Sequence, residues 1–361
     1  MRTLSCFAAS LAAAAAFAAS ENQAGSSQLQ INVQPLSPRA AVFYGGPWDS
    51  AVVALSTQKG IVVLDAPFSK TISKAFRDAI QAEFKRNDFA YLINSHEHSD
   101  HAGGNTAYAD LPIVGHESLR VQMLKAMSDP KIQDNLMAVP EKDLSAAREY
   151  LQKHDPKRLE SPAFASFEQG WKMVQADYRG GLSIVPPTIT FDRRMTLCLG
   201  DLTVRLLYYG YAHSVADIIV SVPEENLVLT ESLFSSGQLP MAGKPGQPAT
   251  PQIVENWLAV LHEIVGEANE NTQFIPGHGR TFMKKPQFQQ FLSYLEKLWS
   301  EVRREKAEGK TLEQAKADLQ LGTRFPETAD LKNVSLAGSI YETPNIHQRN
   351  IEYMWRALES R

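Results

Sequence analysis

The chain has 361 residues, of which 43% are hydrophobic and 21% are charged, and this ordinary globular composition excludes a disordered or fibrous protein. Its 36 lysines and arginines nearly balance its 40 aspartates and glutamates, which gives a net charge of −4. A dedicated nucleic-acid-binding protein would carry a basic excess, so we expect no nucleic-acid partner. The length allows one large domain or two average ones, with a substantial core in either case.

Residues 1–20 have the pattern of a secretory signal peptide: Arg2, an uncharged alanine-rich run, and then small residues. The apolar run is short for a membrane span, so we expect no stable membrane insertion; the alternative is an uncleaved N-terminal anchor. The sequence therefore predicts an exported protein, either periplasmic or secreted. Cleavage would remove Cys6 and leave Cys198, whose apolar neighbours predict a buried structural thiol.

The first half of the chain alternates predicted strands with a helix. Residues 21–39 are polar and predict an irregular lead-in. Helical spacing of apolar residues predicts a helix over 69–85. Short apolar runs predict strands at 51–55, 61–65, 89–94 and 112–115. This order indicates a layered α/β sheet.

Residues 117–185 are charged, helix-forming and interrupted by prolines, which predicts a helical insertion between two halves of the sheet. Its helices are expected at 117–127, 141–152 and 163–178. Strands then resume at 188–191, 195–199, 202–208, 217–222, 227–230 and 273–275, with a helix at 252–265. A C-terminal helical extension over 286–361 follows, with helices at 288–306, 311–319 and 346–358. Thr311 and Gln314 fit a capping box.

The strongest chemical signal is a cluster of three histidines and one aspartate directly after the strand at 89–94. His96 and His98 are two residues apart, so in extended backbone they project to the same side and can hold one metal ion. Asp100 and His101 follow on the turn and can hold a second ion. Imidazole and carboxylate ligands suit zinc and are compatible with iron or manganese.

Two further histidines stand at junctions between strands and loops. His213 lies between two predicted strands, and His278 follows the last predicted strand. Catalytic zinc needs three protein ligands and one open position. With the cluster already present, both histidines are therefore predicted to be metal ligands.

Three motifs together resemble the metallo-β-lactamase-fold hydrolases: His-x-His-x-Asp-His from residue 96, Gly-x-x-His ending at His213, and Pro-Gly-His-Gly around His278. The last motif resembles the glyoxalase II-like branch. The resemblance covers residues 40–285 and implies an α/β fold, a four-layer αβ/βα sandwich with the metals at one edge of two sheets. It also implies two zinc ions per chain.

The resemblance assigns each ligand by position. His96, His98 and His213 would bind the first metal, and Asp100, His101 and His278 would bind the second. Asp100 would in addition act in catalysis by orienting the attacking water.

The chain departs from the family where an aspartate often bridges the two metals. Ser232 stands at that place, and serine is a poor zinc ligand, so we expect the second metal to be held less tightly. Glu231 is one residue out of register, and only a bulge would turn it toward the metals. Asp65, at a strand end, either contacts a ligand histidine or is an ordinary turn residue.

The insertion at 117–185 is a second departure, and we expect it to cover the site and shape substrate choice. Candidate walls of the pocket are Trp48, Tyr208, Tyr209 and Tyr211, with core packing favoured for Tyr208.

The favoured function is an exported zinc hydrolase whose substrate is a small molecule with an ester, lactone, lactam or thioester carbonyl. The sequence indicates no oligomeric state. Three alternatives remain open. A true metallo-β-lactamase is favoured by export and by Ser232. A mononuclear iron enzyme resembling persulfide dioxygenases would leave His101 and His278 unused. A non-catalytic metal-binding protein is disfavoured, because structural zinc is closed by four ligands.

Overall fold

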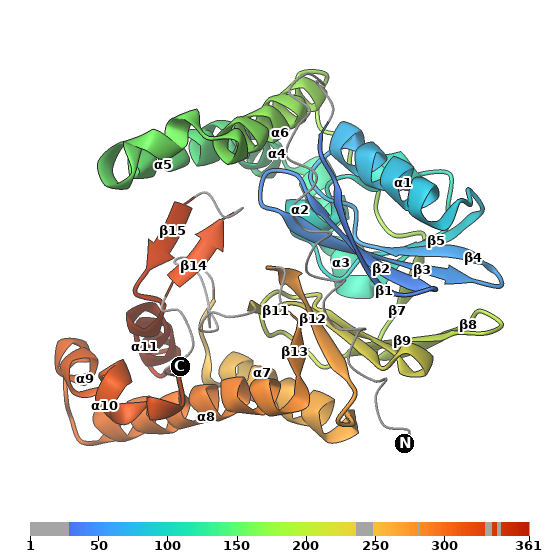
Figure 1. Cartoon of the computed structure of the whole chain (residues 1–361). Helices are drawn as coiled ribbons and strands as arrows, with labels where there is room; N and C mark the ends of the chain where they lie inside the picture. Colours follow the sequence, from blue (N-terminus) through green and yellow to red (C-terminus); the bar gives the residue numbers. More distant parts are fainter. Residues whose placement is uncertain (1–28, 236–247, 280–281, 329–333, 338–340, 361) are drawn as a thin grey trace, which may run out of the picture.

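The computed structural model describes residues 29–235, 248–279, 282–328, 334–337 and 341–360, so the predicted signal peptide lies outside the described residues. Strands and helices are arranged in four layers, helix, sheet, sheet and helix (Figure 1). The predicted α/β fold class is confirmed.

The first half of the sheet is formed by the strands between residues 32 and 191. The first four strands pair antiparallel, and the last four pair parallel. The strands are β1 (Asn32–Ser37), β2 (Ala40–Gly45), β3 (Ser50–Thr57), β4 (Gly60–Leu64), β5 (Phe89–Ile93), β6 (Ile113–His116) and β7 (Ile189–Phe191). Helix α1 (Lys70–Phe84) packs on their outer face.

The second half contains β8 (Arg194–Cys198), β9 (Thr203–Tyr208), β10 (Ile218–Val222), β11 (Leu227–Ser235), β12 (Gln273–His278) and β13 (Met283–Lys284). Strand β12 pairs with β3 through His278 and Ser50, so the two halves form one continuous path of strands. This contact brings the end of β12 to the first half of the sheet.

Alternation of side chains along the strands explains the layers. Val52 and Val63 are buried on the outer face, among residues of α1 and the insertion. Their neighbours Val53 and Leu64 point the other way and are buried against residues of the second half, such as Val220. Because successive side chains on a strand face opposite sides, both faces of these strands are apolar and both are covered.

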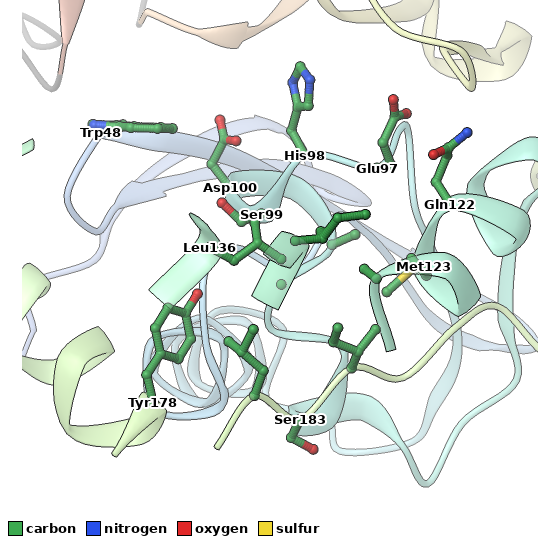
Figure 2. Close-up of a pocket in the computed structure, with 16 residues that line it drawn as sticks. Trp48, Glu97, His98, Ser99, Asp100, Gln122, Met123, Leu136, Tyr178 and Ser183 are labelled. Carbon is green, nitrogen blue, oxygen red and sulfur yellow. The ribbon is translucent and has the colours of Figure 1, made fainter. Parts of the chain in front are cut away.

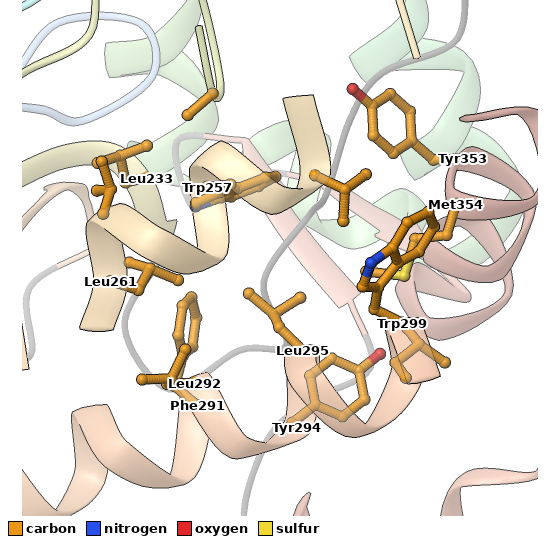
Figure 3. Packing of buried hydrophobic residues seen from close by; sticks show 14 of the residues in the cluster. Leu233, Trp257, Leu261, Phe291, Leu292, Tyr294, Leu295, Trp299, Tyr353 and Met354 are labelled. Carbon is orange, nitrogen blue, oxygen red and sulfur yellow. The ribbon is translucent and has the colours of Figure 1, made fainter. Parts of the chain in front are cut away.

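The outer face of the second half is covered by helices α7 (Pro251–Glu267), α8 (Lys285–Ala307) and α11 (Ile346–Ala357). Figure 3 shows Trp257 of α7 near Phe291 and Leu295 of α8 in this core, and Met354 of α11 near Trp299 of α8 in the same cluster. All five are at most 4% exposed. Burial of side chains of this size contributes about 1.5–3 kcal/mol each.

The insertion contains four helices: α3 (Glu117–Ser128), α4 (Pro130–Met137), α5 (Val139–His154) and α6 (Pro162–Tyr178). The sequence predicted α3, α5 and α6 but not α4. None of the residues of α4 is buried; it begins with Pro130 and an Asp129 side chain that accepts from the Lys131 amide.

Some sequence predictions were wrong in detail. Residues 32–37 of the predicted lead-in form the edge strand β1, which is mostly exposed and so shows no apolar alternation. Cys198 is exposed, because Met195 and Leu197 occupy the inward positions of β8 and leave Cys198 facing outward. His278 is the last residue of β12 rather than following that strand.

The C-terminal extension is not entirely helical. It contains α9 (Leu312–Asp318), α10 (Leu321–Arg324) and a hairpin of β14 (Val334–Ala337) and β15 (Tyr341–Pro344). The predicted capping box is confirmed, since Thr311 accepts from the Gln314 amide and the Gln314 side chain accepts from the Thr311 amide. Within the described ranges, no helix is both long and apolar enough to cross a bilayer.

Candidate metal centre

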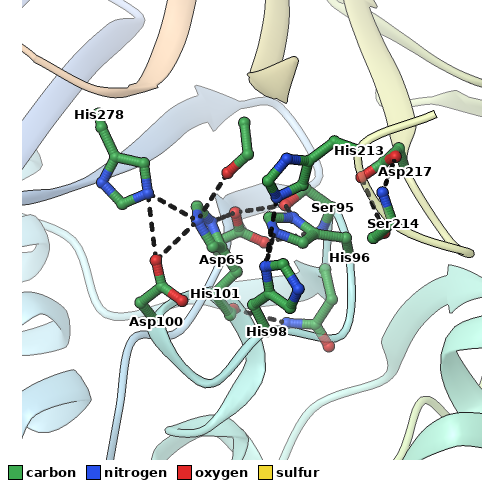
Figure 4. A network of polar contacts seen from close by, with 12 residues as sticks. Asp65, Ser95, His96, His98, Asp100, His101, His213, Ser214, Asp217 and His278 are labelled. Atoms are coloured by element: carbon green, nitrogen blue, oxygen red, sulfur yellow. Dashed lines mark hydrogen bonds and ion pairs between the residues drawn. The ribbon is translucent and has the colours of Figure 1, made fainter. Parts of the chain in front are cut away.

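The six predicted ligands converge on one edge of the sandwich, where strands of both halves end (Figure 4). The chain leaves β5 at Ile93, passes through His96 and His98, and enters the short helix α2 (Ser99–Ala102), which carries Asp100 and His101. His213 lies in the loop between β9 and β10, and His278 ends β12. The side chains form two groups of three.

The first group is His96, His98 and His213. His98 Nδ1 lies 3.2 Å from His96 Nε2 and 3.3 Å from His213 Nε2. His96 and His213 are buried, and His98 is partly exposed. One partly exposed ligand leaves the group open toward solvent.

The second group is Asp100, His101 and His278. Asp100 Oδ2 lies 3.2 Å from His101 Nε2 and 3.1 Å from His278 Nε2, and the two Nε2 atoms are 3.4 Å apart. Ser232 Oγ lies 3.3 Å from His101 Nε2, so Ser232 does face this group, as the family position implied.

The spacing of these atoms fits zinc. Zinc bonds of 2.0–2.1 Å at tetrahedral angles separate neighbouring ligand atoms by ~3.3 Å. The five separations given above, 3.1–3.4 Å, match that edge in both groups. Neutral imidazoles and a carboxylate are also the ligand types that zinc accepts. Each group supplies three ligands and leaves a fourth position free.

Asp65 contacts a ligand histidine, which resolves the two alternatives for this residue. Its Oδ2 accepts a hydrogen bond from His101 Nδ1 at 2.7 Å, and the side chain is buried. Because a carboxylate can only accept here, the Nδ1 proton stays on that side and Nε2 presents a lone pair to the second group. Asp65 has a φ of 71°, in the left-handed region that aspartate and asparagine tolerate best.

Ser95 extends the same arrangement to the first group. Asp65 accepts from the Ser95 amide and from Ser95 Oγ, both at 2.7 Å. The hydroxyl proton is thereby used, so Ser95 Oγ accepts from His96 Nδ1 at 2.9 Å. One carboxylate therefore orients one ligand in each group. Sequence reasoning missed Ser95, although its place directly before the motif was a usable signal.

Side-chain hydrogen bonds and close backbone packing hold the loop that carries His96, His98, Asp100 and His101 in place. Asn94 and Asn105 exchange side-chain hydrogen bonds of 2.9 and 2.8 Å below it. A Cβ on Gly103 would lie 2.5 Å from the carbonyl oxygens of Phe68 and Ser99, so only glycine fits there. The chain can thus turn out of the site immediately after His101.

Burial and neighbouring charges set the protonation of the ligands in the absence of metal. Burial lowers the pKa of His96 well below its usual value, and the adjacent histidines lower it further. Burial alone would raise the pKa of Asp100, but His101 and His278 bring it well below the usual range. Burial opposes the charged form of His101, yet Asp100 and Asp65 raise its pKa overall. Such mutual dependence is typical of a site built for a cation.

The predicted role of Glu231 lies outside the described side chains. Its backbone belongs to β11 and pairs with Pro276, and the register shifts on both sides of that pair. Of the candidate pocket walls, Tyr208 is half-buried, stacks on His116 at 3.5 Å and donates to the Val215 carbonyl.

The comparisons with known proteins agree with this geometry. Residues 45–278 match the family model described as "Metallo-beta-lactamase superfamily". A metallo-beta-lactamase type 2 of Elizabethkingia meningoseptica is 21% identical over 238 residues, which is 65% of this chain and 71% of that protein.

Solved structures of the same fold are similar along most of the chain. A metallo-beta-lactamase from Pontibacter korlensis matches with a TM-score of 0.51 and 15% identity, covering 74% of this chain and 99% of that one. The DIM-1 metallo-beta-lactamase matches with a TM-score of 0.51 and 11% identity over the same shares. With its family match over more than half of its length and two candidate metal triads, the chain belongs to the metallo-beta-lactamase superfamily of metallo-hydrolases.

Proposed function

We propose that the chain is an exported dinuclear zinc hydrolase whose substrate is a small molecule with an ester, lactone, lactam or thioester carbonyl. The main support for this proposal is the pair of adjacent triads, in which neighbouring candidate ligand atoms are 3.1–3.4 Å apart. The rings of His96 and His101, one from each triad, lie only 4.1 Å apart, so two ions would be close neighbours. This favours a dinuclear site over a single iron, which would leave His101 and His278 unused.

Two bound zinc ions would polarise a carbonyl oxygen and lower the pKa of a water. The chain's own residues prepare the site for them. Asp65 holds the Nδ1 proton of His101, and Ser95 does the same for His96. Asp100 Oδ2 faces the second triad between His101 and His278, so Asp100 combines a ligand role with the proposed role of orienting the water.

Elemental analysis of the purified chain, with hydrolysis assays on a panel of esters, lactones, lactams and thioesters, tests this proposal. We expect close to two zinc ions per chain and zinc-dependent hydrolysis of at least one carbonyl class. One iron per chain with oxygen uptake would overturn it in favour of the oxygenase. Absence of any bound metal after incubation with zinc would favour a non-catalytic protein.

A β-lactam substrate is the second candidate. The relatives that match are named metallo-beta-lactamases, and Ser232 stands beside His101 where a bridging aspartate would otherwise be expected. Comparison of kcat/KM for a carbapenem and a penicillin with that for simple esters decides between the two. A value for β-lactams at least tenfold above that for every ester would make β-lactams the substrate.

Export is supported by the composition of residues 1–20. Expression of the full chain, cell fractionation and intact-mass measurement test it. We expect the product outside the cytoplasm to lack about twenty N-terminal residues. A full-length product in the cytoplasm would contradict export.

A further inference from the structure

A pocket of about 370 Å³ lies directly beside the two triads (Figure 2). His98 of the first triad and Asp100 of the second both line it, together with Glu97 and Ser99. Its volume lies within the range of small-molecule sites. His98 and Asp100, one residue from each triad, thus stand at the border of the pocket, so a molecule in the pocket would lie next to the metal centre.

The remaining walls are mostly apolar and come mainly from the insertion. Six of the walls in the insertion are apolar: α3 provides two, α4 another two, and the segment after α6 a further two, beside the polar Gln122, Tyr178 and Ser183. The six apolar residues are Met123, Ala126, Ile132, Leu136, Leu182 and Ile184. The described lining residues include no lysine or arginine, and Glu97 and Asp100 supply carboxylates. Away from the triads, the six apolar side chains offer an anionic group no partner, whereas a neutral apolar group would be stabilised by burial.

Trp48 closes one side of the pocket and is held in place by the insertion. Its indole donates to Asp143 Oδ2 at 2.8 Å, and Trp171 donates to the same oxygen at 2.9 Å. The Trp48 ring also packs edge-on against Phe68, with centroids 5.4 Å apart. This wall is pre-formed, so little ordering is needed when a ligand binds.

We propose that the pocket binds the apolar part of the substrate, a linear acyl or alkyl chain, while the carbonyl group lies at the triads. This inference rests on the proposed function and narrows it to amphiphilic esters, thioesters or lactones with a neutral chain. The insertion thus selects the substrate by the length and polarity of this chain.

Two measurements test the proposal separately. First, calorimetric titration of the purified protein with 1-hexanol, 1-octanol and 1-decanol reports occupation of the pocket without requiring catalysis. Each added methylene is expected to lower Kd about two- to fourfold. Second, hydrolysis of p-nitrophenyl esters from acetate to decanoate by the zinc-loaded enzyme is expected to show KM falling with chain length.

Variants of the pocket lining test whether the dependence on chain length arises in this pocket. Leu136→Gln places an amide in the pocket wall, and Ala126→Phe fills part of its volume. Leu124→Gln is the control, since Leu124 is 44% exposed on α3 and does not line the pocket. We expect both pocket variants to weaken decanol binding about tenfold or more and to flatten the dependence of KM on chain length, and the control to change neither.

The outcomes separate this proposal from the proposed function. Ester hydrolysis that is independent of chain length, with unaltered alkanol binding in both pocket variants, would overturn the pocket proposal and leave the hydrolase intact. Chain-length-dependent alkanol binding without hydrolysis of any carbonyl substrate would overturn the hydrolase and leave the pocket proposal standing. If one pocket variant fails to fold, as judged by circular dichroism, the other decides.

Discussion

Replacement of Asp65 by asparagine should weaken metal binding in both triads, although Asp65 belongs to neither. Its two oxygens accept three hydrogen bonds, from the Ser95 amide, Ser95 Oγ and His101 Nδ1, all at 2.7 Å. Asparagine has one oxygen and one NH₂ group, so in either orientation a donor faces a donor. If the NH₂ group replaces Oδ2, His101 can relieve the conflict by moving its proton to Nε2, the atom that the second metal needs. If it replaces Oδ1, the Ser95 amide loses its acceptor and the residue that orients His96 is displaced.

The expected loss of metal affinity follows from the role of a carboxylate that orients a ligand histidine. Loss of a carboxylate that orients a ligand histidine costs about 10- to 100-fold in metal affinity or activity, which corresponds to about 1.4–2.7 kcal/mol. The backbone should tolerate the change, because asparagine is among the few residues that adopt a φ near 71° readily. We therefore expect a folded variant with a specific metal defect.

Equilibrium dialysis against graded zinc, with atomic emission analysis of the bound metal, measures the effect. The variant should require about 10- to 100-fold more free zinc for full occupancy, and kcat/KM should fall in parallel. Asp78→Asn is the control, since this exposed carboxylate lies outside the site and forms an ion pair with Lys74. Zinc affinity within twofold of the unmodified protein would refute the argument that Asp65 fixes the histidine tautomers.

Further predictions concern the ligands, the fold and the metals themselves. His98→Ala should abolish hydrolysis without altering the far-ultraviolet circular dichroism, because this predicted ligand is partly exposed in the loop directly before α2; retained activity would contradict the assignment. Ser232→Asp should slow the loss of the second zinc to a chelator, since a carboxylate would then face His101, and unchanged release rates would argue against it. Asp143→Ala removes the shared acceptor of Trp48 and Trp171 and should lower the free energy of unfolding in urea by about 2 kcal/mol or more. Dialysis against a chelator should lower the melting temperature and zinc should restore it, whereas a melting curve insensitive to zinc would exclude binding to the folded chain.

Much of the fold and the ligand set could be predicted, because the signals were local. The buried strands β3 and β4 are continuous apolar runs, and the histidine cluster follows β5 directly. Such patterns depend on residues close in sequence, so they can be recognised without knowledge of the tertiary structure. The capping box at Thr311 was predictable for the same reason.

The parts that could not be predicted depend on partners distant in sequence. β1 is a strand only because β2 pairs with it, and its exposed side chains carry no alternation. The exposure of Cys198 depends on which face of β8 meets the core. The orientation of His96 by Ser95 and Asp65 joins residues thirty apart. None of these relations has a spacing that a single sequence reveals.

Metal ions bound in the two candidate triads would have a structural role beside the proposed chemical one. His96, His98, Asp100 and His101 come from the first half of the sheet, whereas His213 and His278 come from the second. Each triad thus takes its third ligand from the opposite half. Because bound metal requires both halves to be in register, it stabilises only the assembled sandwich, by about 2.7 kcal/mol per site when free zinc is 100-fold above Kd. The continuity of β3 and β12 at His278 places that ligand at the junction itself, so the site is most sensitive to the contact between the two halves of the fold.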